Sequence, residues 1–167
     1  MSDGGDALVG SRRGLIRGLG GFLGLGMIGL LPGEAQAARE ERQLRLHSRA
    51  LQEEVRIVYF ADGQYVAEGL EAAKKIFRDR RNDAMIEVDP RLLDLLWTVQ
   101  RRLAPGASLE VVCGYRSPET NAQLRREMRG VATNSYHMYG QAIDLRIPSC
   151  PLRTLHRTAM SLGAGGV

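Results

Sequence analysis

Two proline-marked helix starts constrain the fold of this chain more than any other feature of its sequence. In the pairs Asp89-Pro90 and Ser117-Pro118, a short polar residue directly precedes a proline. Such a residue caps a free amide of the first helical turn, and proline is tolerated next because its missing N–H would have no partner there. A β-type run, "SLEVVCGY" at 108–115, lies between the two predicted helices. The chain therefore alternates helices with strands.

The remaining hydrophobic periodicities extend this alternation. Residues 44–48 and 53–60 predict a pair of strands, followed by an Asp-Gly turn at 62–63. Apolar residues recur at helical spacing from 67 to about 80, and the alternation within 141–147 predicts another strand, after which a last helix follows. This order predicts an α+β fold in which helices pack on a small antiparallel sheet.

The N-terminal segment has the composition of an export signal. Arg12 and Arg13 precede a weakly hydrophobic, glycine-rich stretch at 18–31, and 35–37 form an Ala-Gln-Ala cleavage site. We predict that 1–37 are a twin-arginine-type signal peptide, which makes the twin-arginine translocase a transient partner and the periplasm the destination. The alternative is a membrane anchor, but the apolar run is shorter than the ~20 residues that a span needs. We therefore expect no stable membrane insertion after cleavage.

The charge and aromatic content narrow the choice of partners. The chain carries a formal net charge of +4, which fits an anionic partner such as a cell-wall polymer, a nucleic acid or a membrane surface. Aromatic residues make up only 5% of the chain, whereas a platform for single-stranded nucleic acid needs stacking rings beside its basic residues. We therefore expect no nucleic-acid partner.

The chain has two cysteines, Cys113 and Cys150. An oxidising compartment permits a disulfide between them, and their spacing is not that of a structural zinc site. A disulfide and two free, mostly buried thiols both remain open.

A histidine and an aspartate seven positions apart are the most informative pair in the chain. His137 precedes the strand predicted at 141–147, and Asp144 lies on the strand face opposite its large aliphatic residues. Zn²⁺ accepts one imidazole nitrogen and one carboxylate oxygen as ligands. The alternative is a histidine that caps a loop and an aspartate that pairs with Arg146 or with solvent. Spacing alone leaves both open, because catalytic zinc needs three protein ligands.

The residues around this pair resemble a known family. "SYHMYGQAID" at 135–144 matches the Ser-x-His-x-x-Gly-x-Ala-x-Asp signature of the zinc D-alanyl-D-alanine peptidase and hedgehog-like superfamily. Together with "CGYRSPETN" at 113–121, it is similar to the murein endopeptidase K-like family, and the likeness covers about residues 44–167. The resemblance implies a hedgehog/DD-peptidase-like fold.

The resemblance also implies a cofactor, a substrate and residue roles. Zinc would be held by His137 and Asp144, and the substrate would be the peptides of peptidoglycan. Arg116 would be catalytic and would bind a substrate carboxylate or the developing oxyanion, to which a guanidinium fork is suited. Ser135 would line the substrate site or orient a ligand. The alternatives are a salt-bridged surface arginine and a loop hydroxyl that satisfies backbone.

The chain departs from the family pattern in several places. We assign residues 38–167 to a peptidase-like domain. Relatives continue past the final Gly-Gly-Val with a segment that holds the third zinc histidine, so we expect the C-terminal part of this domain to be missing from the sequence. His47 and His156 are weak substitutes for that ligand. Cys113 stands where relatives usually carry serine, and Arg80 where a histidine is common.

Two functional hypotheses follow. The first is an exported zinc-dependent peptidase that cleaves peptide cross-links in peptidoglycan, with the activity of this shortened form left open. The second is a non-catalytic periplasmic module that binds the cell wall through the same cleft. Whether the chain is a fragment, a frameshift product or a true short form is open at this point.

Overall fold

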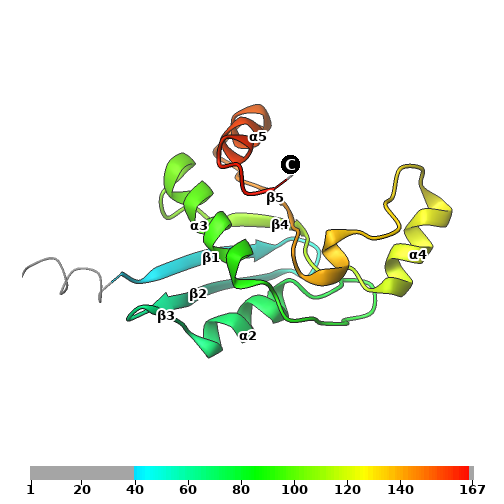
Figure 1. The fold of residues 1–167 in the computed structure, drawn as a ribbon, viewed down its shortest axis with the longest axis horizontal. Helices are drawn as coiled ribbons and strands as arrows, with labels where there is room; N and C mark the ends of the chain where they lie inside the picture. Colours follow the sequence, from blue (N-terminus) through cyan, green and yellow to red (C-terminus); the bar gives the residue numbers. More distant parts are fainter. Residues whose placement is uncertain (1–39, 166–167) are drawn as a thin grey trace, which may run out of the picture. The chain divides into compact units, whose positions relative to one another are not determined.

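Residues 40–165 are described by a computed structural model, and the predicted signal peptide at 1–37 lies outside them. The described residues form an α+β fold, which confirms the predicted fold class (Figure 1). The strands are β1 (Arg42–Ser48), β2 (Glu53–Ala61), β3 (Gln64–Tyr65), β4 (Leu109–Cys113) and β5 (Asp144–Arg146). The helices are α2 (Ala67–Ile76), α3 (Pro90–Leu103), α4 (Pro118–Glu127), the 3-10 helix η1 (Tyr136–Tyr139) and α5 (Leu152–Ser161).

The five strands form one sheet in the order β3-β2-β1-β4-β5. All neighbouring pairs are antiparallel except β1 and β4, which run parallel, with Leu46 opposite Leu109. The parallel pair requires a long crossover, and the chain between β1 and β4 supplies it with β2, β3, α2 and α3. The sequence predicted the pairing of β1 with β2 and an antiparallel sheet, but it indicated neither the partners of β4 nor the one parallel pair.

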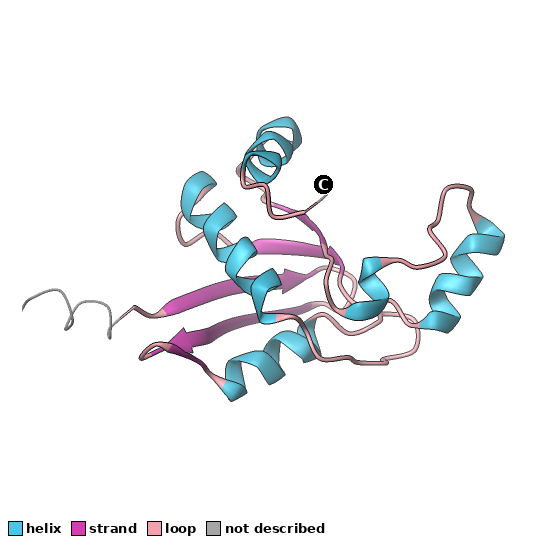
Figure 2. Ribbon diagram, in the orientation of Figure 1, coloured by secondary structure: helices cyan, strands magenta, loops and turns pink. Residues whose placement is uncertain are grey.

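One face of the sheet carries the core. Apolar side chains from β1, β2 and β4 are buried there beneath α2 and α3, which lie against the strands in Figure 2. The innermost of these strand residues are Leu44, Leu46, Ile57, Tyr59, Leu109 and Val111. Each fully buried aliphatic side chain contributes about 1.5–3 kcal/mol to folding. The opposite face is polar and carries pairs such as Arg45 with Glu54 at 2.6 Å, so the sheet alternates as expected of one covered on a single face.

Both predicted helix starts are confirmed. The Asp89 carboxylate accepts a 3.0 Å hydrogen bond from the amide of Arg91, and the Ser117 hydroxyl accepts one of 3.1 Å from the amide of Thr120. Each cap is followed by a proline at the first helical position. These caps fix the directions in which α3 and α4 leave their loops.

The helix predicted from 67 to about 80 ends earlier, at Ile76. The carbonyl of Phe77 accepts a hydrogen bond from the amide of Tyr115 at 2.6 Å, which continues the chain toward the end of β4 instead of another helical turn. The buried Asp79 carboxylate then accepts the amides of Arg81 and Ser117 at 3.0 and 2.9 Å. Tertiary hydrogen bonds therefore override the helical periodicity at this point.

Two further observations bear on the expectations from sequence. Cys113 and Cys150 are both free, so the free-thiol alternative describes this structure. Within residues 40–165, no helix combines the length and the apolar character that crossing a bilayer would require.

Candidate metal and substrate site

The pairing of β4 with β5 builds the floor of the site. Val111 of β4 pairs with Leu145 of β5, and the next pair is Cys113 with Asp144. The step from one pair to the next covers two residues of β4 but one residue of β5, which is a β-bulge. This bulge leaves Val112 exposed. A bulge re-aims the side chains that follow it, and here it places Cys113 directly across from Asp144.

Gly140 holds the segment that carries His137. It ends η1 in the left-handed conformation, with φ of +64°, and its carbonyl accepts a 3.0 Å hydrogen bond from the amide of Asp89. A Cβ at Gly140 would overlap the carbonyl oxygen of Glu87. Only glycine therefore permits both the turn and the close approach of this loop to the start of α3.

The His137 ring is oriented by backbone. Its Nδ1 lies 2.8 Å from the carbonyl oxygen of Gly114, which can only accept, so Nδ1 carries a proton and Nε2 faces the site. Nε2 lies 3.6 Å from Oδ1 of Asp144, longer than a hydrogen bond. The two donors of a tetrahedral zinc lie about 3.4 Å apart when the bonds are near 2.0–2.2 Å. The donor types, the tautomer and the separation all fit zinc.

The charges in the site are coupled. Burial by itself would lower the pKa of His137, but Asp144, Cys113 and the Gly114 carbonyl outweigh it and raise that pKa to about 10. The imidazolium in turn holds the pKa of Asp144 below its usual range, with Arg116 contributing. Burial would raise the pKa of the Cys113 thiol, yet His137 and Arg116 reverse the effect and lower it. The site therefore favours a positive charge beside the Asp144 carboxylate and the Cys113 sulfur.

Arg116 lies beside His137 and Cys113. Its backbone amide donates to the carbonyl of His137 at 3.2 Å, and its Nη2 lies 3.7 Å from Sγ of Cys113. Its Nε is buried without a hydrogen-bond partner among the described residues. Arg116 is thus a half-buried donor at the site rather than a salt-bridged surface arginine, although its catalytic role stays a prediction.

The position of Ser135 gives no direct evidence for a role in the site. It is buried directly before η1, and its carbonyl accepts a 2.9 Å hydrogen bond from the amide of Met138. Its hydroxyl does not cap the 3-10 helix. Its proposed contact with substrate or with a ligand stays a prediction.

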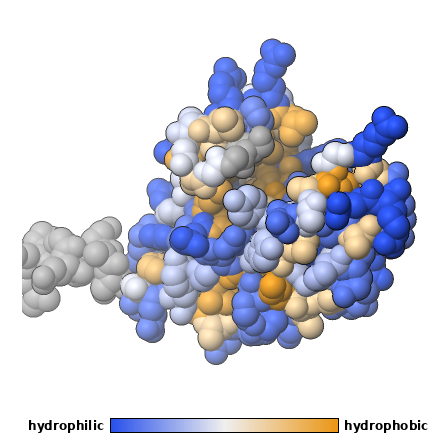
Figure 3. Space-filling view, turned by 45° about the vertical axis from the view of Figure 1, so that its right-hand side comes forward, coloured by the Kyte–Doolittle hydropathy of each residue, from blue (hydrophilic) through white to orange (hydrophobic). Residues whose placement is uncertain are grey.

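Two cavities meet at Asp144. One, of about 270 Å³, is lined by Cys113 and Arg116 together with three further arginines: Arg78, Arg80 and Arg81. The other, of about 1160 Å³, contains His137 and is walled mainly by leucines of α3 and α5. Figure 3 shows hydrophobic surface in a recess below α5. The candidate site therefore has a basic side and an apolar side.

Neither substitute histidine joins the site. His47 lies in β1 opposite Glu54 and Glu110 on the polar face of the sheet. His156 lies on α5 in the wall of the larger cavity, but it is outside the cluster of donor groups. The cluster consists of Cys113, His137 and Asp144, whose ligand atoms lie within 4.8 Å of one another, and it is the single such group of three or more within residues 40–165.

Cys113 was not predicted from the sequence to belong to this cluster. The substitution of cysteine for the usual serine was the available signal. Regular strand alternation would have put Cys113 on the same face as Val111, toward the core. The bulge that overturns this alternation is visible only in the structure.

Comparisons with known proteins agree with the resemblance seen in the sequence. Residues 36–167 match the family described as peptidoglycan L,D-endopeptidase MepK. The chain is 46% identical over 93 residues to the probable peptidoglycan L,D-endopeptidase MepK of Haemophilus influenzae, an alignment that covers 55% of this chain and 50% of that protein. It is 36% identical over 126 residues to the peptidoglycan L,D-endopeptidase MepK of Escherichia coli K12, covering 75% of this chain and 69% of that protein. No solved structure matches the chain.

Proposed function

The chain belongs to the peptidoglycan L,D-endopeptidase MepK family, and from that premise we propose that it is an exported zinc peptidase that cleaves peptide cross-links in peptidoglycan. The observation that carries the proposal is the convergence of His137 Nε2 and Asp144 Oδ1 at 3.6 Å, with the imidazole tautomer fixed by Gly114. Both relatives above are named for an L,D bond, so the proposed scissile bond joins an L centre to a D centre.

His137 and Asp144 would hold the metal, and the residues around them would orient the reaction. When bound, zinc would supply a Lewis acid for the scissile carbonyl and an acidified water. The Gly114 carbonyl keeps the imidazole in the ligating tautomer, which is a common second-shell arrangement. Arg116 presents its guanidinium beside the cluster, where it would donate to the oxyanion or to a substrate carboxylate.

The two cavities suit a cross-linked peptide. In the smaller cavity, Arg78 and Arg81 are already paired with carboxylates of this chain. Arg116 and the exposed Arg80 form no ion pair among the described residues, so they would attract the carboxylates that the peptides of the cell wall carry. The larger cavity offers apolar wall to the aliphatic parts of the peptide. Ser135 would orient the segment that carries His137 and so act on substrate position indirectly.

Export by the twin-arginine route forms part of the proposal. The paired Arg12 and Arg13 and the cleavage site at 35–37 support it. The names of the relatives point to peptidoglycan, which lies outside the cytoplasmic membrane. The translocase would be a partner during export, and peptidoglycan peptides would be the partner afterwards.

The test is hydrolysis of defined cross-linked muropeptides by the full chain, purified from the periplasm. We expect release of peptides from substrates whose cross-link joins an L centre to a D centre, loss of activity with a chelator and recovery with zinc. Substrates cross-linked through two D centres serve as the specificity control. Binding to intact peptidoglycan with no release of peptide, with or without zinc, would replace the peptidase with the non-catalytic binding module.

A further inference from the structure

We infer that Arg80 is a specificity-determining residue of the proposed peptidase, and that its guanidinium binds a free carboxylate of the substrate peptide in the smaller cavity. The chain therefore distinguishes a cell-wall peptide with free carboxylates from the same peptide with carboxamides. The inference rests on the proposed function in one respect, namely that the ligand is a peptidoglycan peptide. The carboxylate belongs either to a side chain or to the C-terminus of that peptide, and the test separates the two sources.

Arg80 is the open cation of the smaller cavity. Two of the other arginines that line this cavity already hold carboxylates of the chain itself. Arg78 donates to both carboxylate oxygens of Glu53, at 2.7 and 2.8 Å, and Arg81 lies 3.8 Å from Glu127. Arg80 is exposed and has no ion pair or side-chain hydrogen bond among the described residues. Its charge therefore remains available to an anion from outside the chain.

The backbone that carries Arg80 is held in place by hydrogen bonds on both sides. The amide of Asp79 donates to the carbonyl of Ala84 at 2.9 Å, and the amide of Asp83 donates to the carbonyl of Asp79 at 2.8 Å, which closes a turn around Arg80. The buried Asp79 carboxylate accepts the amide of Ser117 at 2.9 Å and so ties this turn to the start of α4. A preorganised backbone loses less conformational entropy when a ligand binds.

The same cavity reaches the proposed zinc site. Arg116 and Asp144 line it together with Arg80, so a substrate group that enters the cavity lies close to the metal ligands. Arg116 is half-buried, with its Nη2 3.7 Å from Sγ of Cys113, whereas Arg80 is exposed. The two guanidiniums therefore suit different tasks, one beside the reacting carbonyl and the other at a substituent of the peptide.

The size of the cavity and the chemistry of arginine define the ligand group. At about 270 Å³, the cavity is smaller than the pockets of about 300–1,000 Å³ that enclose a whole small molecule, so it accepts one substituent of a longer peptide. A guanidinium offers two parallel N–H donors that match the two oxygens of a carboxylate. A carboxamide has one oxygen and no charge, so Arg80 favours the free acid.

The test measures the binding of uncleavable peptides, in which a neutral isostere replaces the scissile amide, to the zinc-loaded full chain by isothermal titration calorimetry. One analogue has free carboxylates, a second is amidated at its side-chain carboxylate, and a third is amidated at its C-terminus. The variants are Arg80→Gln and Arg80→Lys. Arg125→Gln is the matched control, because it removes an exposed charge of α4 that does not line the cavity.

We expect the parent to bind the free-acid analogue at least about tenfold more tightly than one of the two amidated analogues, because the charge-assisted hydrogen bonds are lost with the carboxylate. Arg80→Gln should bind all the analogues with affinities within about twofold of one another. Arg80→Lys should keep part of the preference, since it retains the charge without the planar fork. Arg125→Gln should keep all of it, and circular dichroism checks that every variant is folded.

A parent that binds the analogues equally, or binds none of them, overturns the inference. A preference that survives in Arg80→Gln, or that Arg125→Gln loses to the same extent, overturns it as well. The proposed function fails separately, because the binding preference is measured without turnover. If the preference depends on Arg80 but cleavable substrates release no peptide, the carboxylate site stands and the peptidase falls. If free and amidated substrates are cleaved with equal kcat/KM, the peptidase stands and the carboxylate site falls.

Discussion

Cys113 and Asp144 face one another across β4 and β5 because a bulge at Val112 shifts the register by one residue. In an unbroken ladder, Cys113 would share the core-facing side with Val111, and Asp144 would have no neighbour with a metal-ligating side chain on β4. The shift brings a sulfur, a carboxylate and the His137 imidazole to one place. The geometry of the site therefore depends on a local irregularity of the sheet as much as on the signature residues.

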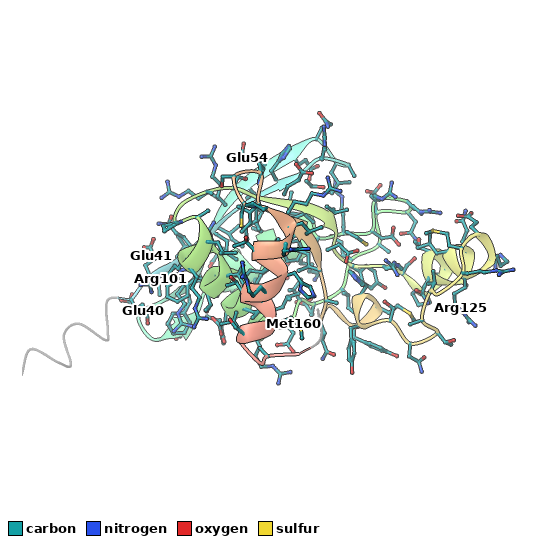
Figure 4. The ribbon with its side chains drawn as sticks, turned by 90° about the horizontal axis from the view of Figure 1, so that it is seen from above. Glu40, Glu41, Glu54, Arg101, Arg125 and Met160 are labelled. Atoms are coloured by element: carbon teal, nitrogen blue, oxygen red, sulfur yellow. The ribbon has the colours of Figure 1, made fainter. Side chains whose placement is uncertain are left out.

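Arg116 is the side chain that we expect to matter most for turnover without holding the metal. Replacing it with alanine should lower kcat/KM for the cross-linked peptide by about 10²–10³-fold, the usual effect of removing an oxyanion donor, while zinc content stays unchanged. Steady-state hydrolysis and elemental analysis measure the two quantities. Arg125→Ala is the control, because Arg125 projects from α4 into solvent, away from α3 (Figure 4). An Arg116→Ala enzyme with full activity would remove this arginine from the mechanism.

Asp79 ties the segment after α2 to the start of α4, next to Arg116. Its carboxylate is fully buried and accepts the amides of Arg81 and Ser117. The Asp79→Asn substitution keeps the shape of the side chain but replaces one carboxylate oxygen, a hydrogen-bond acceptor, with an amide NH₂ group, a donor that faces a backbone amide. We expect the free energy of unfolding to fall by about 1–3 kcal/mol in chemical denaturation. Asp83→Asn, at an exposed position, should change it by less than about 0.5 kcal/mol.

The same carboxylate should make stability depend on pH. Burial alone would raise the pKa of Asp79, but hydrogen bonds from Thr120, Arg81 and Ser117 lower it below its ordinary value of 3.8. Because the pKa of Asp79 is lower in the folded state than in the unfolded state, the ionised carboxylate stabilises the fold. This contribution is fully present above the unfolded-state pKa of 3.8 and is lost as the pH falls through the folded-state pKa. The unfolding free energy of the parent should therefore fall more steeply below that pH than that of Asp79→Asn. Parallel curves for the two proteins would contradict this assignment.

Gly140 should tolerate no side chain. Alanine there combines an unfavourable positive φ with overlap on the Glu87 carbonyl, whereas Gly106, with φ of +76°, has open space around its would-be Cβ. Gly106→Ala should cost about 1–2 kcal/mol from the backbone conformation alone. Gly140→Ala should cost clearly more and should weaken metal binding as well, because the loop carries His137. Equal losses of stability in thermal melts would show that the close contact has no energetic weight.

The sequence predicted the helix starts and the fold class because these depend on local chemistry. Asp89, Ser117 and their prolines act within one helical turn, so their effect can be inferred from neighbours in the chain. The premature end of α2 could not be predicted, since it depends on hydrogen bonds from Tyr115 and Ser117, almost forty residues away.

The candidate site also contains residues that the sequence predicts and one that only the structure reveals. His137 and Asp144 were predicted because they belong to one short signature, and the structure brings them together. The contribution of Cys113 depends on the pairing of two strands and on a bulge within one of them, which no periodicity along a single strand can reveal.

The convergence of His137 and Asp144 on one zinc ion is tested most directly by the zinc content of the purified full chain. We expect about one zinc per chain, retained in His156→Ala, a histidine in the wall of the larger cavity but outside the cluster. His137→Ala and Asp144→Ala should each weaken zinc binding more than about 100-fold while their circular dichroism spectra stay unchanged. A folded chain that takes up no zinc, or variants at these two positions that bind it as tightly as the parent, would contradict the account.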